Sequence, residues 1–362
     1  MKDVDYIDTA EALEQFCNKH SSEDTLMLDT EFLRERTYQP KLCLIQLASA
    51  QGIGIIDPLN VSEKQTLWEL LSTRTLVMHA ARQDLEVFEI EFGALPERIF
   101  DTQIAAGLCG YAPQIGYGAL VESICGVTLD KAHTRTDWSR RPLSDSELEY
   151  AADDVRYLPA VLDTLSESLA EKNRLCWAEA DSALQLRPEL YALDFIKAQF
   201  RVKGLSRLRG LSHARARALS RWREEKAVNR NLPRQWVLKD AEILALAEVN
   251  PDSSESVAAA FLSAASAKRH GHTVARLLRE TTDDGQDIQP RARPDAEEKA
   301  LAKQLGKKVT DVAQTLSIEA EVLAPMKEVR AIAAGERDTR VNTGWRRELL
   351  GAELTRIADA GA

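Results

Sequence analysis

The stretch from Leu143 to Leu158, LSDSELEYAADDVRYL, contains a helix start followed by an apolar stripe. Ser144 followed three residues later by Glu147 is a capping-box pattern, which predicts a helix that begins here and continues to about residue 173. Apolar residues then recur at helical spacing and define one buried stripe: Leu148, Ala151, Ala152, Val155, Leu158 and Leu162. We therefore expect a long helix packed along one side against a core.

Tyr150 and Asp154 lie four residues apart, so they share one face of this predicted helix. Asp154 falls at the edge of the apolar stripe, whereas Asp153 falls on the solvent side. The helix would thus present a phenol and a carboxylate together at the rim of a core. Because the same pair also occurs on ordinary surface helices, it becomes informative only together with residues from other segments.

The segments upstream predict a mixed sheet. Three apolar runs with short connections are expected to form strands in an antiparallel meander: 25–32, 41–49 and 52–58. A fourth strand, 75–80, precedes a helix that Gly93 should end, and Ser62 with Gln65 predicts another helix start. Strands followed by alternating strands and helices are typical of a layered α/β architecture.

Three further acids stand at informative positions on these elements. Asp29 and Glu31 are two residues apart on the first predicted strand, so both carboxylates point to the same face of the sheet. Burying them would be costly without a neutralising partner, and an exposed edge strand is the structural alternative. Asp84 stands where the fourth strand turns into its helix, a position typical both of active-site acids and of helix caps.

Taken together, the acids of the three segments predict a metal site. Four carboxylates brought close together repel one another, and divalent cations usually compensate this repulsion. Ligands that are all oxygen favour Mg²⁺ or Mn²⁺ over zinc. Two such ions about 4 Å apart can clamp the attacking and leaving oxygens of a phosphoryl transfer. The predicted chemistry is hydrolysis of phosphodiester bonds.

These residues resemble the motifs of the DEDD exonuclease superfamily. The first motif, D-x-E, corresponds to residues 29–31, the second to Asp84 within HAARQDLEVF, and the third to YAADD at 150–154. The superfamily's other branch has a histidine at the position of Glu149, so this chain resembles the tyrosine branch. The sequences of residues 25–48 and 136–158 are similar to those of the ribonuclease D family in particular, and the resemblance covers about residues 5–175. The resemblance implies an RNase H-like α/β sheet with flanking helices.

The resemblance also implies roles for the site residues. Asp29, Glu31 and Asp154 would hold the ion that activates water, Asp29 would bridge to a second ion, and Asp84 would complete the site. Tyr150 would hydrogen-bond to the attacking water and position it, because a free phenol loses its proton only near pH ~10. The implied cofactors are two divalent ions, Mg²⁺ or Mn²⁺.

Four neighbouring residues are candidates for substrate binding by the same resemblance. Thr30 and Phe32 flank the acids and would pack on the terminal nucleotide, while Trp138 and Arg140 would contact the substrate backbone. Structural alternatives stay open: Phe32 can belong to the core, and Trp138 can anchor the loop before the catalytic helix.

The second half of the chain has a different character. The chain carries a net charge of -10, yet residues 195–231 contain eleven Lys or Arg against two acids, which predicts either a polyanion contact or a solvated helix face. The helices that follow resemble the helicase-and-RNase-D C-terminal (HRDC) domain. The predicted domains are an exonuclease domain at 1–178, an HRDC domain at 205–285 and a second, degenerate HRDC-like domain at 292–362.

The function implied by the resemblance is a 3′ to 5′ exoribonuclease that releases 5′-mononucleotides from RNA 3′ ends, with tRNA precursors among its substrates. A DNA exonuclease and an inactive nucleic-acid-binding module are the alternatives. Five scattered cysteines without a CxxC pair, no apolar signal segment and no membrane span predict a cytoplasmic protein. Nothing in the sequence requires more than a monomer.

Overall fold

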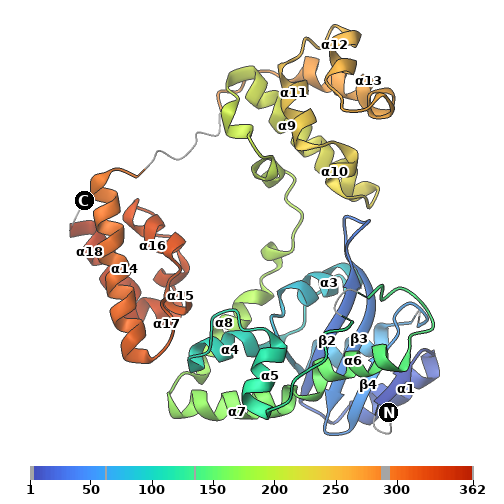
Figure 1. The fold of residues 1–362 in the computed structure, drawn as a ribbon, viewed down its shortest axis with the longest axis vertical. Helices are drawn as coiled ribbons and strands as arrows, with labels where there is room; N and C mark the ends of the chain where they lie inside the picture. The colour runs from blue at the N-terminus through green and yellow to red at the C-terminus, as the bar shows by residue number, and fades with distance from the viewer. Residues whose placement is uncertain (1–3, 62, 134–135, 287–293, 361–362) are drawn as a thin grey trace. The chain divides into compact units, whose positions relative to one another are not determined.

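The computed structural model describes residues 4–61, 63–133, 136–286 and 294–360, and the chain divides into two compact units. Unit 1 comprises Met1–Phe32, Leu42–Tyr191 and Pro294–Ala362, and unit 2 comprises Leu33–Lys41 and Ala192–Arg293. The ribbon in Figure 1 shows an α/β part with helices around a sheet, and helical parts built without strands.

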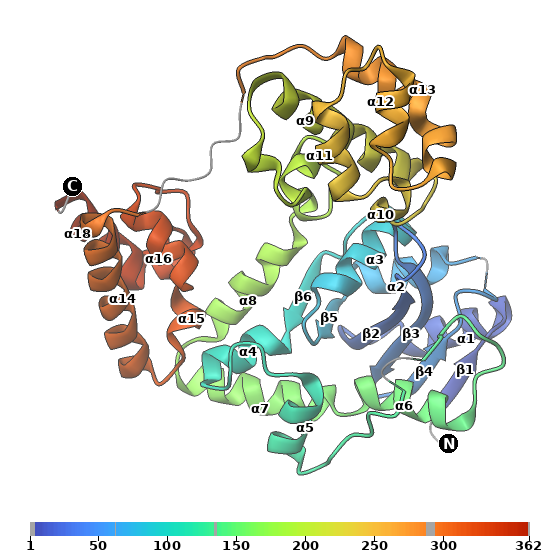
Figure 2. The ribbon, with the colours of Figure 1, turned by 45° about the horizontal axis from the view of Figure 1, so that its top comes forward.

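A six-stranded mixed sheet forms the centre of unit 1, in the order β1-β4-β3-β2-β5-β6. Its strands are β1 (Val4–Ile7), β2 (Thr25–Leu33), β3 (Lys41–Ser49), β4 (Gly52–Ile56), β5 (Thr75–Met78) and β6 (Arg98–Asp101). β3 and β4 pair antiparallel, whereas β1 with β4, β2 with β5, and β5 with β6 pair parallel. β2 is therefore an inner strand (Figure 2).

Helices cover both faces of this sheet, and β2 contributes alternate residues to the two cores. Leu26 and Leu28 pack with α1 (Ala10–His20), α2 (Gln65–Ser72) and α3 (Arg82–Phe92). Met27 packs in the opposite core, which is completed by α4 (Thr102–Cys109), α5 (Tyr117–Cys125), α6 (Asp145–Arg156), α7 (Leu158–Glu171) and α8 (Leu175–Ala183). This alternation follows from the two-residue period of a strand.

The predicted α/β class with a mixed sheet is confirmed, but the number of strands is larger than the sequence suggested. The four predicted strands are present, and Gly93 ends α3 in the left-handed conformation, with φ 69°. β1 and β6 were not predicted, because each has only four residues and β6 runs directly into α4. Ser62 lies outside the described residues; α2 begins at Gln65, and Lys64 at its N-cap provides no side-chain hydrogen bond.

The predicted helix from Ser144 begins as expected but is divided in two. Both bonds of the capping box between Ser144 and Glu147 are present. The expectation of one helix to about residue 173 is wrong: α6 ends at Arg156 and α7 starts at Leu158. Pro159 lies in the first turn of α7, where its missing N–H costs no hydrogen bond within that helix but would break a continuous one.

Unit 2 is helical. It contains η3 (Lys197–Arg201), η4 (Leu205–Arg207), α9 (Gly210–Asn229), α10 (Arg234–Val237), α11 (Asp240–Glu248), α12 (Ser254–Ala259) and α13 (Ala264–Glu280). The loop between β2 and β3 also belongs to this unit: the Tyr38 hydroxyl donates to Glu224 Oε1 at 2.6 Å, and Asn231 Oδ1 accepts the Tyr38 and Gln39 N–H groups at 3.0 and 2.9 Å. Two short 3₁₀ segments precede the unit: η1 (Leu184–Leu186) and η2 (Pro188–Leu190).

The C-terminal helices pack within unit 1. They are α14 (Ala296–Leu316), α15 (Ala320–Leu323), α16 (Met326–Ala333), η5 (Arg340–Asn342), α17 (Gly344–Arg346), the π-helical turn η6 (Arg347–Gly351) and α18 (Ala352–Ala360). Arg346 makes a bidentate ion pair with Asp181 of α8, with both N–O distances 2.6 Å. Beside this pair, the rings of Trp345 and Trp177 stack at 4.2 Å. No helix among the described residues has both the length and the apolar character needed to cross a membrane.

The two helical segments share a repeated order of elements. α9, α10 and α11 start at residues 210, 234 and 240, and α14, α15 and α16 each start 86 residues later, at 296, 320 and 326. A left-handed residue follows the long first helix of each segment: Asn231 (φ 48°) lies two residues after the end of α9, and Ser317 (φ 52°) is the C-cap of α14. An internal repeat of this kind is consistent with two related helical domains.

Candidate active site

Asp29 and Glu31 project from β2 on the side of the core that contains Met27. Both side chains are partly buried. Since β2 is an inner strand with β3 and β5 on either side, the alternative of an exposed edge strand does not apply to these acids. Two acids on an inner strand need compensation for their charge.

Asp84 is the third residue of α3 and is only 6% exposed. The hydroxyl of Thr30, on the intervening position of β2, donates a hydrogen bond to Asp84 Oδ1 at 2.5 Å. Thr30 is itself buried. This bond ties the acid-bearing strand to the start of α3 and sets the orientation of the Asp84 carboxylate.

α6 contributes Asp154 and Tyr150, both partly buried. The Tyr150 ring has aromatic neighbours on two sides: the Trp138 ring lies 5.9 Å away at an angle of 30°, and the His133 ring lies 5.8 Å away in an edge-on arrangement. Trp138 is almost fully buried, with 2% of its surface exposed. The tyrosine is therefore held by packing on a rigid helix.

The four acids interact electrostatically. Burial raises the pKa of Asp29 well above its usual range, and the charges of Asp84, Asp154 and Glu31 raise it further. Burial, with Asp154 and Asp84, raises the pKa of Glu31 to about 8. The pKa values of Asp84 and Asp154 rise to about 7, again mainly through burial. The structure thus brings together the four acids that the sequence separates into three segments.

This set of oxygen ligands suits hard divalent cations such as Mg²⁺ or Mn²⁺. In the described part of the chain, no three His, Cys, Asp or Glu side chains are placed so that they could hold a metal ion together. The acids instead share one buried region, in which Asp84, Asp154 and Glu31 raise the pKa of Asp29, and Asp154 and Asp84 raise the pKa of Glu31. A bound cation would offset that cost, so the residues present fit a divalent metal.

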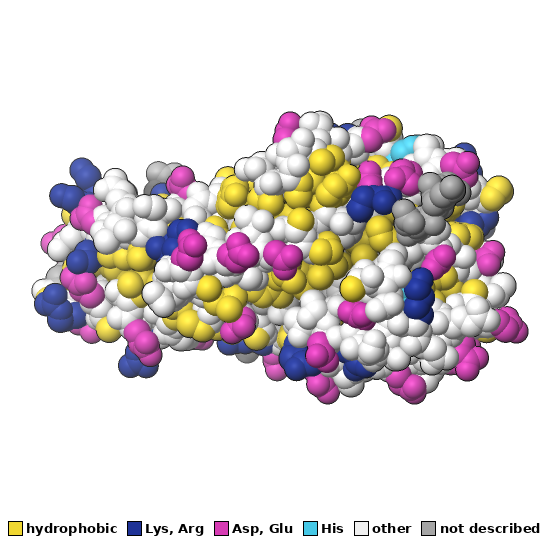
Figure 3. Space-filling view, turned by 90° about the horizontal axis from the view of Figure 1, so that it is seen from below, with side chains coloured by type: hydrophobic (Ala, Val, Ile, Leu, Met, Phe, Trp, Pro, Cys, Tyr) yellow, Lys and Arg dark blue, Asp and Glu magenta, His cyan; other side chains and the backbone are white. Residues whose placement is uncertain are grey.

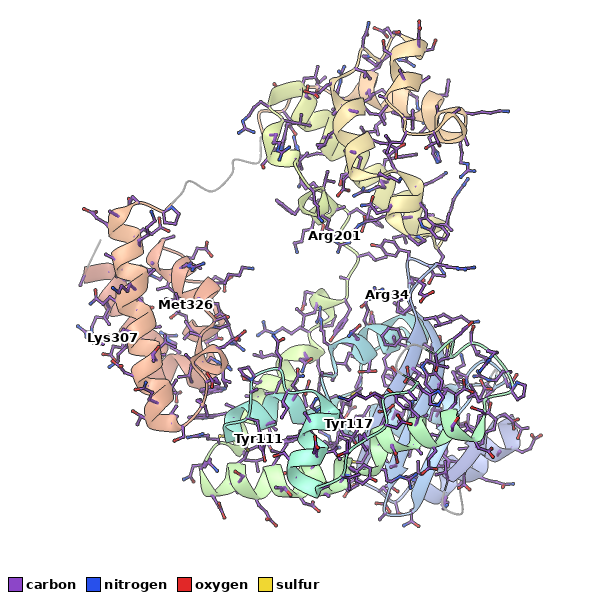
Figure 4. The ribbon with its side chains drawn as sticks, viewed as in Figure 1. Arg34, Tyr111, Tyr117, Arg201, Lys307 and Met326 are labelled. Carbon is purple, nitrogen blue, oxygen red and sulfur yellow. The ribbon has the colours of Figure 1, made fainter. Side chains whose placement is uncertain are left out.

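A cavity of about 340 Å³ opens beside Tyr150 and Asp154. Helices α5 and α6 and residues 129–131 form its walls. Tyr117, labelled in Figure 4, lines the cavity from α5 and donates its hydroxyl to the Asp153 carbonyl at 3.1 Å. A volume of this size is within the range of small-molecule sites. Tyr117 was not predicted, because no motif marks a residue that reaches the site from another helix.

The loop before α6, which the family resemblance suggests as a substrate contact, is anchored by Arg141, in line with the alternative that this arginine caps a carbonyl. Arg141 donates to both oxygens of Asp57 at 2.6 and 2.7 Å, and to the carbonyls of Cys43 and Trp138 at 2.9 and 2.7 Å. Arg140, in contrast, leaves 66% of its side chain exposed while it contacts Glu147 at 2.8 Å. The loop thus carries one buried and one accessible guanidinium.

The other predicted substrate-binding residues lie in different surroundings. Phe32 is partly buried and packs against the core on the face opposite to Asp29 and Glu31. Thr30 uses its hydroxyl to hold Asp84. Trp138 is covered and contacts Tyr150. Among these candidates, Arg140 has the most accessible side chain.

Four acids from three elements beside a tyrosine, on a mixed sheet covered by helices, define a 3′–5′ exonuclease domain. A family model described as a 3′–5′ exonuclease matches residues 4–170, and an HRDC domain model matches residues 212–278. Ribonuclease D of Granulibacter bethesdensis is 35% identical over 96% of this chain and 90% of that protein. Ribonuclease D of Acidiphilium cryptum is 34% identical over 97% of this chain and 92% of that protein.

A solved structure leads to the same family. The crystal structure of Escherichia coli RNase D, described as an exoribonuclease involved in structured RNA processing, superposes with a TM-score of 0.89 at 30% identity and covers 99% of both chains. The catalytic core of RRP6 from Trypanosoma brucei shares the fold, with a TM-score of 0.62 at 24% identity over 76% of this chain and 79% of that one. The chain belongs to the ribonuclease D family and is a 3′–5′ exoribonuclease that acts on RNA. Membership of this exonuclease family implies a divalent-metal cofactor.

Proposed function

We propose that this exoribonuclease releases 5′-mononucleotides from RNA 3′ ends with two divalent ions, Mg²⁺ or Mn²⁺, held by Asp29, Glu31, Asp84 and Asp154. The mutual effect of these four acids on their pKa values supports the assignment. When bound, such ions lower the pKa of water and stabilise the charge that develops on phosphate oxygens.

The protein side chains around the acids have complementary tasks in this proposal. Tyr150 donates a hydrogen bond that orients the attacking water. The Trp138 ring packs against the Tyr150 ring and holds it in place. Thr30 orients Asp84. The rigid positions of these groups on β2, α3 and α6 favour one geometry of attack.

The substrate in this proposal is RNA with a single-stranded 3′ end, including tRNA precursors, bound by a monomer. The cavity beside Tyr150 and Asp154 would receive the terminal nucleotide. Arg140 would contact a backbone phosphate, since its guanidinium is exposed. The description of the E. coli relative as a structured-RNA processing enzyme supports the choice of substrate.

The proposed domains are an exonuclease domain at 1–178, an HRDC domain at 205–285 and a degenerate second HRDC-like domain at 292–362. The HRDC model matches within the second range. The elements that repeat 86 residues apart support the relation between the two helical domains.

A time course on end-labelled RNA with a single-stranded 3′ tail tests the mechanism. We expect stepwise release of mononucleotides with Mg²⁺ or Mn²⁺ and none with chelator. Tyr150→Phe should slow release by roughly 100-fold, because the attacking water loses the hydroxyl that positions it, and Asp154→Asn should abolish release. Asp145→Asn is the matched control, because Asp145 lies exposed on the same helix. Full activity of Asp154→Asn would contradict the proposed site.

A further inference from the structure

The helical bonding of α6 is interrupted close to Asp154. One residue, Tyr157, separates α6 from α7, so the carbonyls in the last turn of α6 lose their usual helical partners. The carbonyl of Asp153 belongs to this set. In a continuous helix the Tyr157 N–H would bond to it, but here this N–H bonds to the Val155 carbonyl. The position of Asp154 therefore depends on what else holds this end of α6.

The hydroxyl of Tyr117 binds the Asp153 carbonyl. Tyr117 is the first residue of α5, and its hydroxyl donates to this carbonyl at 3.1 Å. The backbone of Tyr157 also hydrogen-bonds to the same hydroxyl. The hydroxyl thus lies between a carbonyl and an N–H that would bond to each other directly in a continuous helix. A side chain inserted in this way bends or breaks a helix, so Tyr117 acts here together with Pro159.

The Tyr117 ring is held in turn by His79, the residue after β5. The two rings lie 5.6 Å apart at an angle of 55°. His79 Nε2 donates to the carbonyl of Ile115 at 2.9 Å, and its Nδ1 lies 2.9 Å from the Thr102 hydroxyl. Gln103 donates to the same Ile115 carbonyl at 3.0 Å. The start of α5 is therefore tied to the end of β5 and to α4, which gives the Tyr117 hydroxyl a fixed position.

Acidic groups surround the Tyr117 hydroxyl, and it keeps its proton. On the face of the molecule shown in Figure 3, acidic and basic side chains are interspersed. Around Tyr117 the charges are acidic instead: burial raises its pKa, and Asp154, Asp29 and Asp153 raise it further. Only a protonated phenol can donate to a carbonyl, so these surroundings maintain the bond to Asp153. Two of these acids, Asp29 and Asp154, belong to the proposed metal site.

We propose that Tyr117 is a positioning residue for Asp154 and, through it, for the divalent metal. Its hydroxyl bonds to the backbone one residue before Asp154, at the break in α6, and so sets where that carboxylate lies relative to Asp29 and Glu31 on β2. Groups that orient a metal ligand contribute measurably to metal affinity. The proposal rests on the proposed function, in which Asp154 binds a metal ion, and adds the residue that places this ligand.

Removal of single hydroxyl groups separates this role from a purely stabilising one. Tyr117→Phe keeps the ring that lines the cavity and removes only the bond to Asp153. Tyr191→Phe is the matched control, since the Tyr191 hydroxyl also donates to a backbone carbonyl, that of Gln185 at 2.7 Å. Tyr111→Phe is a second control. Tyr111, labelled with Tyr117 in Figure 4, packs against the same core, and its hydroxyl forms no hydrogen bond in the part of the chain that the structure describes.

Mn²⁺ binding to the full-length protein is measured by isothermal titration calorimetry without RNA, and the melting temperature of each metal-free variant checks its folding. We expect Tyr117→Phe to bind Mn²⁺ roughly 10-fold more weakly, the lower end for loss of a group that orients a metal ligand. Both controls should bind Mn²⁺ like the wild type.

Hydrolysis of end-labelled RNA provides a second measurement of the same variants. At a fixed, moderate Mn²⁺ concentration, the kcat of Tyr117→Phe should fall while its KM for RNA stays at the wild-type value, because the ring in the cavity is retained. A higher Mn²⁺ concentration should restore part of the lost rate, since the defect lies in metal affinity.

Wild-type affinity for Mn²⁺ in Tyr117→Phe would overturn the proposal. Equal weakening in Tyr191→Phe would also overturn it, because the loss of any such hydrogen bond would then have the same effect. Failure of the proposed function gives a different result: the wild-type protein would bind no Mn²⁺, or Asp154→Asn would bind it as tightly as the wild type. Asp154 would then be no metal ligand, and the proposed role of Tyr117 would fall with it.

Discussion

The hydroxyl group of Thr30 sets the orientation of the Asp84 carboxylate in the candidate site. Burial raises the pKa of Asp84, and the hydrogen bond from Thr30 opposes that rise, with a net value of about 7. The Thr30 hydroxyl thus fixes one oxygen of the Asp84 carboxylate. Alternation along β2 thus gives neighbouring residues different tasks: Asp29 and Glu31 supply charge, and Thr30 orients a fourth acid.

The raised pKa values lead to a prediction about pH. Glu31, Asp84 and Asp154 have folded-state pKa values of about 8, 7 and 7, above those of unfolded chains near ~4. The metal-free folded protein then binds more protons than the unfolded chain, so its stability should fall as pH rises from about 5 to about 8. Metal binding requires the deprotonated acids and releases these protons.

We therefore expect the increase in melting temperature caused by Mn²⁺ or Mg²⁺ to grow between about pH 6 and about pH 8. Differential scanning fluorimetry with and without metal measures this increase. Asp145→Asn should behave like the wild type, whereas Asp154→Asn should lose most of the metal effect. An increase that is the same at both ends of the range would show that protons and metal do not compete at these acids.

The four acids and Tyr150 could be proposed as a site from the sequence because short motifs with regular spacing carry them. The contacts that orient these residues could not be predicted from the sequence. Thr30 bonds to a residue 54 positions away, and Arg141 to one 84 positions away. Pairing over such distances is determined by the packing of the sheet and is not encoded in local spacing.

At the scale of elements, the loop before α6 is fixed to the sheet by one ion pair. Asp57 is fully buried and accepts hydrogen bonds from Arg141, from the Tyr6 hydroxyl at 2.6 Å and from Asn60 at 2.9 Å. Burial alone would raise the pKa of Asp57, but the hydrogen bonds from Arg141 and Tyr6 bring it below its usual value. The loop before α6 is thus held by the ionised Asp57 carboxylate, which accepts hydrogen bonds from Arg141, Tyr6 and Asn60.

Removing the charge of Arg141 should leave that carboxylate without its cation. We expect Arg141→Met to lower the free energy of unfolding by about 3 kcal/mol, the lower end for a broken buried pair, because other donors to Asp57 remain. Arg140→Met is the control at the neighbouring residue and should cost about 1 kcal/mol or less, since the Arg140 side chain is largely exposed and Ser144 still donates to Glu147. Denaturant unfolding followed by circular dichroism measures both values. Equal costs for the two variants would disprove the anchoring role.

Element boundaries were predictable at two of the cap signals and were missed elsewhere; α2, for example, begins at Gln65 and not directly after Ser62. Ser144 with Glu147 and Gly93 marked ends that the structure confirms. The division between α6 and α7 was missed, although Pro159 lies in the sequence, because the apolar stripe continues across it. Helical spacing of apolar residues alone does not distinguish one bent helix from two.

At the scale of the whole molecule, the C-terminal helices join the catalytic unit through a small buried cluster. Asp181 accepts both hydrogen bonds of Arg346 and a third from the Trp345 indole at 3.1 Å. The side chains of Asp181 and Arg346 are 8% and 4% exposed. The Arg346 guanidinium also lies 4.1 Å from the centre of the Trp345 ring. An ion pair, a ring stack and hydrogen bonds thus connect α8 to the C-terminal helices within unit 1.

Neutralising this aspartate should loosen the C-terminal helices. We expect Asp181→Asn to lower the free energy of unfolding by about 3 kcal/mol, since the Arg346 cation stays buried without its counter-charge. Asp359→Asn removes the acid of the exposed pair with Arg337 and should cost less than about 1 kcal/mol. Denaturant unfolding monitored by tryptophan fluorescence measures both values, and the stacked Trp177 and Trp345 are two of the six tryptophans that contribute to the signal. Identical unfolding curves for the two variants would contradict this account.

The assignment of the loop after β2 to unit 2 has a practical consequence for dissecting the enzyme. The chain passes between the units at four junctions, after Phe32, Lys41, Tyr191 and Arg293. A truncated enzyme that ends near Tyr191 would therefore lack Glu224 and Asn231, which bind the Tyr38 hydroxyl and two backbone N–H groups of that loop. Weak activity of such a fragment would reflect a disturbed end of the catalytic strand as much as the loss of RNA contacts, so point variants are the better tool for separating the two.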